Sequence, residues 1–217
     1  MRRTLASLAL SIAALATAHA TAHAATDAAP DALVRKSIDE VLSTIKADKE
    51  LQNGNPRKVQ ALVEEKVIPH FDFSRMTRLA VGRSWSQASD AQKEALTREF
   101  QALLVRTYST SISQYRNQVI EVKPARVAAG DKDTLVKTVV IQPGGQPIPI
   151  DYGMEKSDRG WKVYDVLVDG VSLVTTYRSS FNDQIQKSGI DGLVKTLADR
   201  NRSSEAPKAP VKVDLKK

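Results

Sequence analysis

One stretch of the sequence predicts how the chain folds: Arg159-Gly-Trp-Lys-Val-Tyr-Asp-Val-Leu-Val-Asp-Gly-Val-Ser-Leu-Val-Thr-Thr-Tyr-Arg-Ser-Ser-Phe181. Its first part, from Trp161 to Val168, is rich in aromatic and β-branched residues, which favour β-strands. Asp169-Gly170 interrupts this run, and the apolar residues that follow are three or four positions apart rather than two. The change in spacing predicts a core strand that leads directly into a core helix.

Asp165 lies inside the predicted strand, where an unpaired carboxylate is costly to bury. We expect this carboxylate to accept hydrogen bonds from a helix N-terminus or to pair with an arginine such as Arg178. A catalytic pair of Asp165 and Asp169 is the alternative, since both fall on the same face of the predicted strand. Asp169-Gly170 is, however, first of all a turn sequence.

Two helices are predicted at the start of the chain. An apolar face begins after Asp31, and Asn53-Gly54 ends it. Asn55 is expected to cap a second helix that has Pro56 at its first position. The apolar residues of these two helices are Val34, Ile38, Val41, Leu42, Ile45, Val59, Leu62, Val63 and Val67.

Two further helices are predicted by their capping residues. Asp72 is expected to cap a short helix that Gly82 closes, with Phe71 and Phe73 on either side of the cap. These phenylalanines indicate either core packing or one wall of a pocket. The segment from Ser89 to Gln92 is a capping box, and it is expected to begin the longest helix.

From Val119 onward the apolar period becomes two, which predicts β-strands. Short turn sequences separate the strands, so we expect an antiparallel meander with one face exposed to water. Ser188-Gly189 is expected to divide the last helical region in two. The predicted strands are 119–128, 133–142, 147–156 and 161–168. The order helices, strands, helices predicts an α+β fold in which a curved antiparallel sheet carries helices on one face, an arrangement that can enclose an apolar cavity.

The first 24 residues have the features of a cleavable signal peptide. Arg2 and Arg3 make the start basic, and a mostly apolar run extends to Ala18. Ala22-His23-Ala24 provides the expected Ala-x-Ala cleavage site, and Ala18-His19-Ala20 is the alternative. The apolar run is shorter than the roughly 20 residues that a membrane-spanning helix needs. We therefore predict an exported chain with a signal peptide at 1–24, one domain at 25–200 and a disordered basic tail at 201–217.

The formal net charge of +7 is concentrated at the two ends of the chain. Removal of residues 1–24 takes away two arginines and no acids and leaves +5, of which the tail 201–217 carries +3. The domain between them is nearly neutral. Nucleic acid is therefore not expected as a partner.

The sequence contains little that could support catalysis or metal binding. It has no cysteine, and His70 is the only histidine outside the predicted signal peptide. A thiol nucleophile is therefore impossible, and a single chain cannot build a multi-histidine metal site. The G-x-S-x-G nucleophile motif is absent as well. We expect no catalytic residues, no metal and no cofactor.

The order and spacing of several motifs resemble the MlaC family of periplasmic phospholipid-binding and transport proteins, also described as toluene-tolerance auxiliary proteins. The resemblance covers roughly residues 30 to 200. It rests on Phe71-Asp72-Phe73, Met76, Gly82, Trp85, the box at 89–92, Phe100, Leu104, Thr107-Tyr108, Tyr115, the run from Trp161 to Val166, the run from Asp169 to Val174, Tyr177-Arg178 and Phe181.

The resemblance implies a monomeric, non-enzymatic carrier in the periplasm that has glycerophospholipid as its cargo. Such carriers exchange lipid between an outer-membrane lipoprotein and porin complex and an inner-membrane ABC transporter complex with an MCE-domain ring, and thereby maintain outer-membrane lipid asymmetry. The resemblance also implies an NTF2-like cone, in which acyl chains lie between the sheet and the helices and the head group lies near solvent.

Alternation along the strands and the apolar faces of the helices assign the wall of this lipid-binding pocket. Solid core packing is the alternative for each residue, and a one-residue error in register would invert the assignment for a whole strand. The predicted strand residues are Val139, Ile141, Ile148, Ile150, Tyr152, Met154, Tyr164, Val166 and Val168. The predicted helical residues are Phe71, Phe73, Leu79, Phe100, Leu104, Tyr108, Leu173, Val174 and Tyr177.

Two other functions are compatible with the same residues. One is a non-enzymatic periplasmic adaptor or interaction domain with a filled core. The other is a small-molecule enzyme on the same type of fold, with Asp165 and a tyrosine as its reactive groups. Lipid that co-purifies with the protein would distinguish a carrier from an adaptor.

Overall fold

The computed structural model describes residues 28–115, 118–203 and 210. The predicted signal peptide and most of the predicted tail lie outside the described residues. The last described helix extends to Arg202, so it includes the first two residues of the predicted tail.

The elements follow the predicted order of helices, strands and helices. The first group comprises α1 (Pro30–Ala47), α2 (Lys49–Gln52), α3 (Pro56–Leu62), the π-helical turn η1 (Val63–Val67), the 3₁₀ turn η2 (Ile68–His70), α4 (Phe73–Val81), the 3₁₀ segment η3 (Gly82–Gln87) and α5 (Asp90–Ser113). The strands are β1 (Val119–Val122), β2 (Asp133–Ile141), β3 (Ile148–Ser157), β4 (Gly160–Val168) and β5 (Val171–Ser172), and α6 (Leu173–Arg202) follows.

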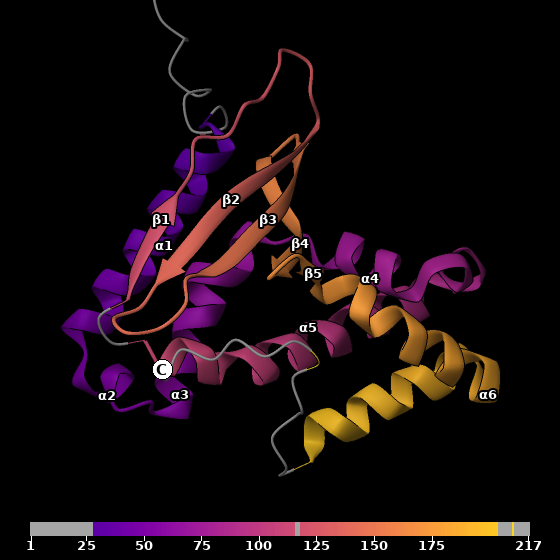
Figure 1. Cartoon of the computed structure of the whole chain (residues 1–217). Helices are drawn as coiled ribbons and strands as arrows, with labels where there is room; N and C mark the ends of the chain where they lie inside the picture. The colour runs from indigo at the N-terminus through magenta and orange to yellow at the C-terminus, as the bar shows by residue number, and fades with distance from the viewer. Residues whose placement is uncertain (1–27, 116–117, 204–209, 211–217) are drawn as a thin grey trace, which may run out of the picture.

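The five strands form one open antiparallel sheet in the order β1-β2-β3-β4-β5 (Figure 1). The predicted α+β fold and the meander are thus confirmed, and β5 is an additional short strand. β1 ends at Val122, well before the predicted residue 128. Pro124 explains the difference, because proline lacks the N–H that a strand needs and restricts the residue before it.

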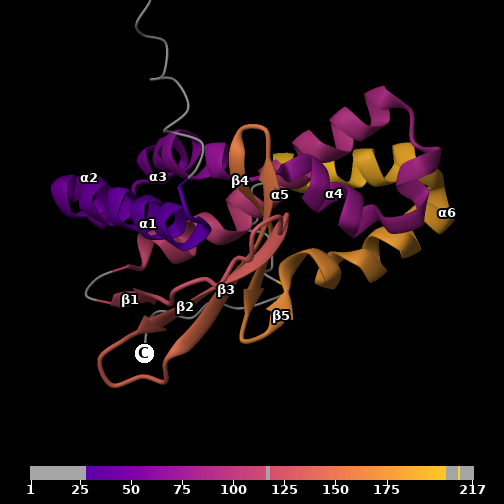
Figure 2. The same ribbon diagram turned by 90° about the horizontal axis from the view of Figure 1, so that it is seen from above.

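The helices cover one face of the sheet and extend beyond one of its edges. Viewed from above, α1, α2 and α3 lie over one face of the sheet, whereas α4 and α6 reach outward past β4 and β5 (Figure 2). The long helix α5 connects these two groups. Its first half packs with α4 and α6, and its second half lies beside α3.

The capping residues act as the sequence predicts. Asp72 accepts a hydrogen bond from the Arg75 N–H at 2.8 Å, and the Asn55 side chain caps α3. Ser89 and Gln92 bond reciprocally, at 2.9 and 3.2 Å, at the start of α5. Gly82 ends α4 with a positive φ of 66°, a conformation that glycine adopts without steric cost.

A β-bulge interrupts the pairing of β3 with β4. Tyr152 pairs with Val166 and Gly153 with Asp165, but the next residue, Met154, pairs with Val163. Tyr164 is therefore the extra residue of the bulge. A Cβ on Gly153 would lie 3.3 Å from the ring of Tyr164, so glycine leaves the space that this ring occupies.

Asp165 connects β4 to the first turn of α6. Its carboxylate accepts hydrogen bonds from Ser172 Oγ at 2.5 Å, from the Val166 N–H at 2.9 Å and from the Val174 N–H at 3.2 Å. Ser172 in turn caps α6 through the Thr175 N–H. Of the two structural roles predicted for Asp165, binding to a helix N-terminus is confirmed. Arg178 donates instead to the Leu79 carbonyl.

The helix α6 consists of two segments separated at Gly189, where φ is 72°. This is the break that Ser188-Gly189 predicts. Both segments pack on α4 and α5 around Phe100 and Phe181, which are almost completely buried. The two rings lie 5.1 Å apart in an edge-to-face arrangement, a favourable geometry for aromatic pairs.

Replacement of Asp165 with Ala is expected to lower the free energy of unfolding by about 2 kcal/mol, because two partly buried N–H groups and one hydroxyl lose their acceptor. Urea denaturation at neutral pH measures this loss.

Burial raises the pKa of Asp165 above its ordinary value despite these hydrogen bonds, so the folded protein tolerates a neutral side chain there. Asp165→Asn, which keeps one acceptor oxygen, should therefore lose less stability. Equal stability of Asp165→Ala and the original protein would contradict this role.

Candidate functional site

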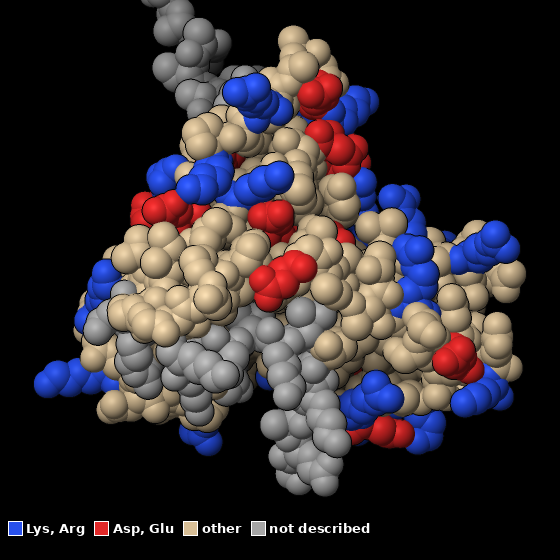
Figure 3. Space-filling view, in the orientation of Figure 1, with Lys and Arg blue, Asp and Glu red and all other residues tan. Residues whose placement is uncertain are grey.

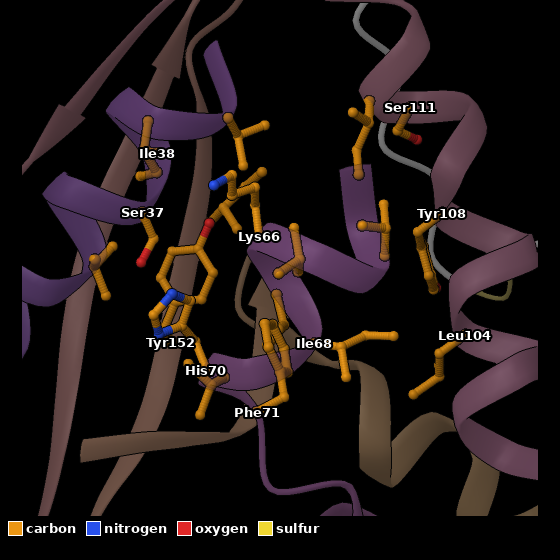
Figure 4. A pocket seen from close by; sticks show the side chains of 18 of the residues that line it. Ser37, Ile38, Lys66, Ile68, His70, Phe71, Leu104, Tyr108, Ser111 and Tyr152 are labelled. Carbon is orange, nitrogen blue, oxygen red and sulfur yellow. The ribbon is translucent and has the colours of Figure 1, made fainter. Parts of the chain in front are cut away.

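A cavity of about 340 Å³ lies between the helix-covered face of the sheet, α1, the turns η1 and η2, and the second half of α5 (Figure 4). Its volume falls within the range of roughly 300–1,000 Å³ that is common for ligand sites. Its lining is almost entirely apolar. The sheet contributes Ile120, Val140, Ile150, Tyr152, Met154, Val163, Val166 and Val168.

The helix α1 forms one wall because its apolar residues recur every three or four positions. Residues at this spacing share one face of the helix, and that face is directed at the cavity. The α1 residues that line it are Leu33, Val34, Ser37, Ile38, Val41, Leu42 and Ile45. The turns η1 and η2 continue this wall with Val63, Lys66, Val67, Ile68 and His70.

The opposite wall is formed by the second half of α5. The lining residues on this helix are Leu104, Val105, Tyr108, Ser109, Ser111 and Ile112, and Tyr115 follows just after the helix ends. Aliphatic and aromatic carbon dominates here too. Figure 4 shows Leu104, Tyr108 and Ser111 along one side of the cavity and Ser37, Ile38 and Tyr152 along the other.

Three hydroxyl groups in the wall, those of Ser37, Ser109 and Tyr152, bond to the protein itself. Ser37 Oγ donates to the Leu33 carbonyl at 2.9 Å, and Ser109 Oγ donates to the Val105 carbonyl at 2.5 Å. Tyr152 hydrogen-bonds to Thr138, and burial raises the pKa of its hydroxyl to about 12. These groups are therefore occupied and neutral, so this wall is suited to hydrocarbon rather than to a polar molecule.

Two lining residues differ in character from the rest. Lys66 forms an ion pair with Glu65, with Nζ 2.8 Å from the carboxylate. His70 is half-buried, and burial lowers the pKa of its imidazole, as do the nearby charges of Lys162 and Lys36. Both lie at the end of the cavity near α1 (Figure 4).

Ten of the eighteen residues predicted to bind lipid line this cavity. They come from the sheet, from α5, from the start of α6, and from the start of α4 and the residues just before it. They are Phe71, Phe73, Leu104, Tyr108, Ile150, Tyr152, Met154, Val166, Val168 and Leu173. Their contact with a lipid stays a prediction.

The predicted face of β2 is wrong by one residue. Val140 lines the cavity, and Val136 and Thr138 are buried on the same face. Val139 and Ile141 consequently point to the other side, where Ile141 is 36% exposed. Because side chains alternate along a strand, a shift of one residue moves the whole set to the opposite face. Ile148, the first residue of β3, is not among the lining residues either.

The bulge explains the error at Tyr164. Simple alternation back from Val168 and Val166 places Tyr164 in the cavity. The bulge residue breaks this alternation, so that Val163 lines the cavity in its place. The Tyr164 ring lies instead against the Arg75 guanidinium, 3.6 Å from its carbon to the ring centroid, and Arg75 also pairs with Asp133 and Glu155.

Four predicted helical residues belong to a filled core rather than to the cavity: Leu79, Phe100, Val174 and Tyr177. Phe100 and Tyr177 pack edge to face with ring centroids 5.1 Å apart. The same apolar periodicity thus produces a solid core between α4, α5 and α6 and a hollow one under the sheet. Side-chain spacing alone could not separate the two.

The prediction omitted the entire wall that α1 and η1 provide. The signal was present, because the sequence shows the apolar face of α1 from Val34 to Ile45. What was missing is the position of that helix over the sheet. This position depends on contacts between residues far apart in the chain, among them the hydrogen bond from Arg35 to the Val122 carbonyl at 2.8 Å.

The described residues provide no obvious centre for metal-dependent chemistry. Within residues 28–115, 118–203 and 210, no three His, Cys, Asp or Glu side chains are grouped so that they could hold a metal ion. In the same part of the chain, no helix is both long and apolar enough to span a membrane.

Asp169 has a positive φ of 50° at the β4–β5 turn, as its Asp-Gly sequence predicts.

The outer face of the sheet carries charges of both signs. In Figure 3, lysine and arginine side chains are interspersed with aspartate and glutamate rather than gathered in one patch. Val119, Leu135 and Ile141 are exposed among them.

Comparison with known proteins finds relatives along most of the chain. The sequence profile of the MlaC protein family matches residues 35–199. A phospholipid-binding protein from Ralstonia solanacearum, solved in complex with a phospholipid, is 44% identical with a TM-score of 0.74, and the match covers 80% of this chain and 97% of that chain. Toluene tolerance protein ttg2D of Pseudomonas putida is 28% identical over 166 residues, which is 76% of either chain. The intermembrane phospholipid transport system binding protein MlaC of Haemophilus influenzae is 23% identical over 168 residues, 76% of this chain and 78% of that protein.

Replacement of Val140 with Trp is expected to fill part of the cavity and to weaken binding of an uncharged apolar probe, N-phenylnaphthylamine, by about tenfold, because the probe and the indole compete for the same space. Fluorescence titration of delipidated protein measures the affinity. Val139→Trp is the matched control, since its side chain lies on the opposite face. Equal binding by the two variants, both folded by circular dichroism, would show that the face of β2 is assigned incorrectly.

Proposed function

Because this chain belongs to the MlaC protein family, we propose that it binds a glycerophospholipid and encloses its acyl chains in the cavity under the sheet. The observation that carries the proposal is an almost wholly apolar cavity in a chain 44% identical to a protein solved with a phospholipid. The ten predicted residues that line this cavity would then contact the acyl chains.

The physical driving force is the hydrophobic effect. Transfer of acyl chains from water contributes about 0.8 kcal/mol per methylene group. An apolar cavity therefore holds such chains strongly without directional bonds. This explains how a site with so few available polar groups can still bind its ligand.

We propose further that the protein is a carrier in the periplasm. It would exchange lipid between an outer-membrane lipoprotein and porin complex and an inner-membrane MCE-domain ABC transporter complex, and thereby maintain the lipid asymmetry of the outer membrane. Family membership and the predicted signal peptide at 1–24 support this role. Free phospholipid crosses water slowly because its acyl chains are insoluble, so a carrier must shield them as this cavity could.

The two alternative functions have less support. The adaptor alternative assumes a filled core, whereas the core beneath this sheet contains a cavity. The enzyme alternative uses Asp165, whose carboxylate binds the start of α6 and is not among the lining residues. We expect folded Asp165→Asn to transfer lipid at the original rate, since the carboxylate serves the fold and not the ligand.

The central experiment is purification without detergent, followed by organic extraction and mass spectrometry. We expect glycerophospholipid in a constant molar ratio to the folded, monomeric protein. Folded protein that carries no phospholipid would overturn the proposed function.

Ile150→Glu and Val166→Glu are expected to reduce the extracted lipid more than about tenfold, because each places a charge against the acyl chains. Leu135→Glu is the matched control, since this exposed residue lies on the same sheet but not in the cavity wall. Full lipid content in a folded Ile150 or Val166 variant would show that these side chains do not face the ligand.

A further inference from the structure

The cavity wall contains one side chain with a full charge at neutral pH. Among the described lining residues, Lys66 is the sole Lys, Arg, Asp or Glu. It lies in η1, between Val63 and Val67, which line the same wall. A lone cation in an otherwise apolar wall indicates a ligand that joins hydrocarbon to an anion.

The position of Lys66 suits contact with a group at the cavity rim. Its side chain is 34% exposed, so the aliphatic stem can lie along the apolar wall while the ammonium reaches the boundary with water. The hydrogen bond with Glu65 raises the pKa of Lys66, which keeps it charged throughout the physiological range.

The ion pair between Lys66 and Glu65 does not prevent contact with a ligand. The Glu65 side chain is 72% exposed, and exposed pairs of this kind contribute little to stability. The Lys66 ammonium also has three donors, so it can bind a second oxygen while it keeps its bond to Glu65.

Other polar groups converge on the same end of the cavity. Ser37 of α1, Lys66 of η1, His70 of η2 and Tyr152 of β3 lie together there, whereas α5 forms the far side (Figure 4). The charges that act on His70 come from Lys36, Glu40 and Lys162, and Lys162 Nζ donates to the Pro69 carbonyl. Together with Lys66 and Glu65, three lysines and two glutamates surround this end, an arrangement that favours a single negative charge.

We propose that Lys66 binds the phosphodiester of the enclosed lipid and so selects lipids by their phosphate. This inference rests on the proposed function. The phosphodiester is shared by all glycerophospholipids, and Lys66 is the one lysine in the wall. The protein should therefore accept phosphatidylethanolamine and phosphatidylglycerol alike but disfavour diacylglycerol, which has the same chains without the charge.

To test this inference, the protein is incubated with mixed vesicles that contain equal amounts of phosphatidylethanolamine, phosphatidylglycerol and diacylglycerol with identical acyl chains. Re-isolated protein is extracted, and the three lipids are quantified by mass spectrometry. We expect each phospholipid to exceed diacylglycerol by about three- to fivefold, the size of a partly exposed ionic contact.

Lys66→Met keeps the aliphatic stem and removes the charge, so it should abolish this preference, whereas Lys66→Arg should retain it. Lys36→Met is the matched control, because Lys36 lies near the same end but outside the wall. If Lys36→Met and Lys66→Met lose the preference equally, the preference arises from the general positive charge at this end of the cavity and not from a specific contact with Lys66. This result would overturn the inference.

The original protein alone can also refute the inference. If it takes up diacylglycerol as readily as the two phospholipids, Lys66 does not select for phosphate, although the carrier function stands. If it takes up none of the three lipids, the proposed function itself fails.

Discussion

The arrangement of the cavity depends on how the Asp165 carboxylate is held at the end of β4. Its bonds to Ser172 and to the N–H groups of Val166 and Val174 join the sheet to the first turn of α6. These bonds satisfy a half-buried charge that would otherwise oppose folding. The hydrogen bonds of Asp165 lie next to the bulge at Tyr164. The same short segment therefore determines the register of β4 and the position at which α6 begins.

The bulge determines which side chains the cavity receives from β4. Without it, Tyr164 would occupy the place that Val163 takes. A tyrosine is much larger than a valine, and its ring would fill space that is now open. The contacts of Tyr164 with Arg75 and of Arg75 with Asp133 and Glu155 stabilise the ring on the outer side. Gly153 permits this position because it has no Cβ.

The two halves of the molecule show how one chain contains both a solid and a hollow core. Between α4, α5 and α6, aromatic rings of Phe100, Tyr177 and Phe181 fill the space with centroids 5.1–5.5 Å apart. Beneath the sheet, mostly aliphatic side chains surround a cavity. An open cavity forfeits dispersion contacts, and a bound acyl chain would restore them. Stability and the proposed function thus depend on different parts of the same helix, α5.

Local features of the sequence determined the elements and their ends. Asn55, Asp72 and the box at 89–92 predicted three helix starts, Gly189 predicted a helix break, and the period-two runs predicted the long strands. These signals act over a few residues, so they can be recognised without knowledge of the fold. The motifs from Trp161 to Phe181 also resembled the MlaC family, and the family comparison confirms that resemblance.

Only the tertiary structure decided which faces line the cavity. The inner face of β2 depends on the pairing of this strand with β3. The position of Val163 in the cavity wall depends on a bulge between two strands. The role of α1 as a wall depends on its position over a sheet that is distant in the sequence. Each of these is a contact between segments far apart in the chain. The amphipathic pattern of a helix or strand shows that one face is buried, but the element packed against that face determines whether it meets other side chains or an open cavity.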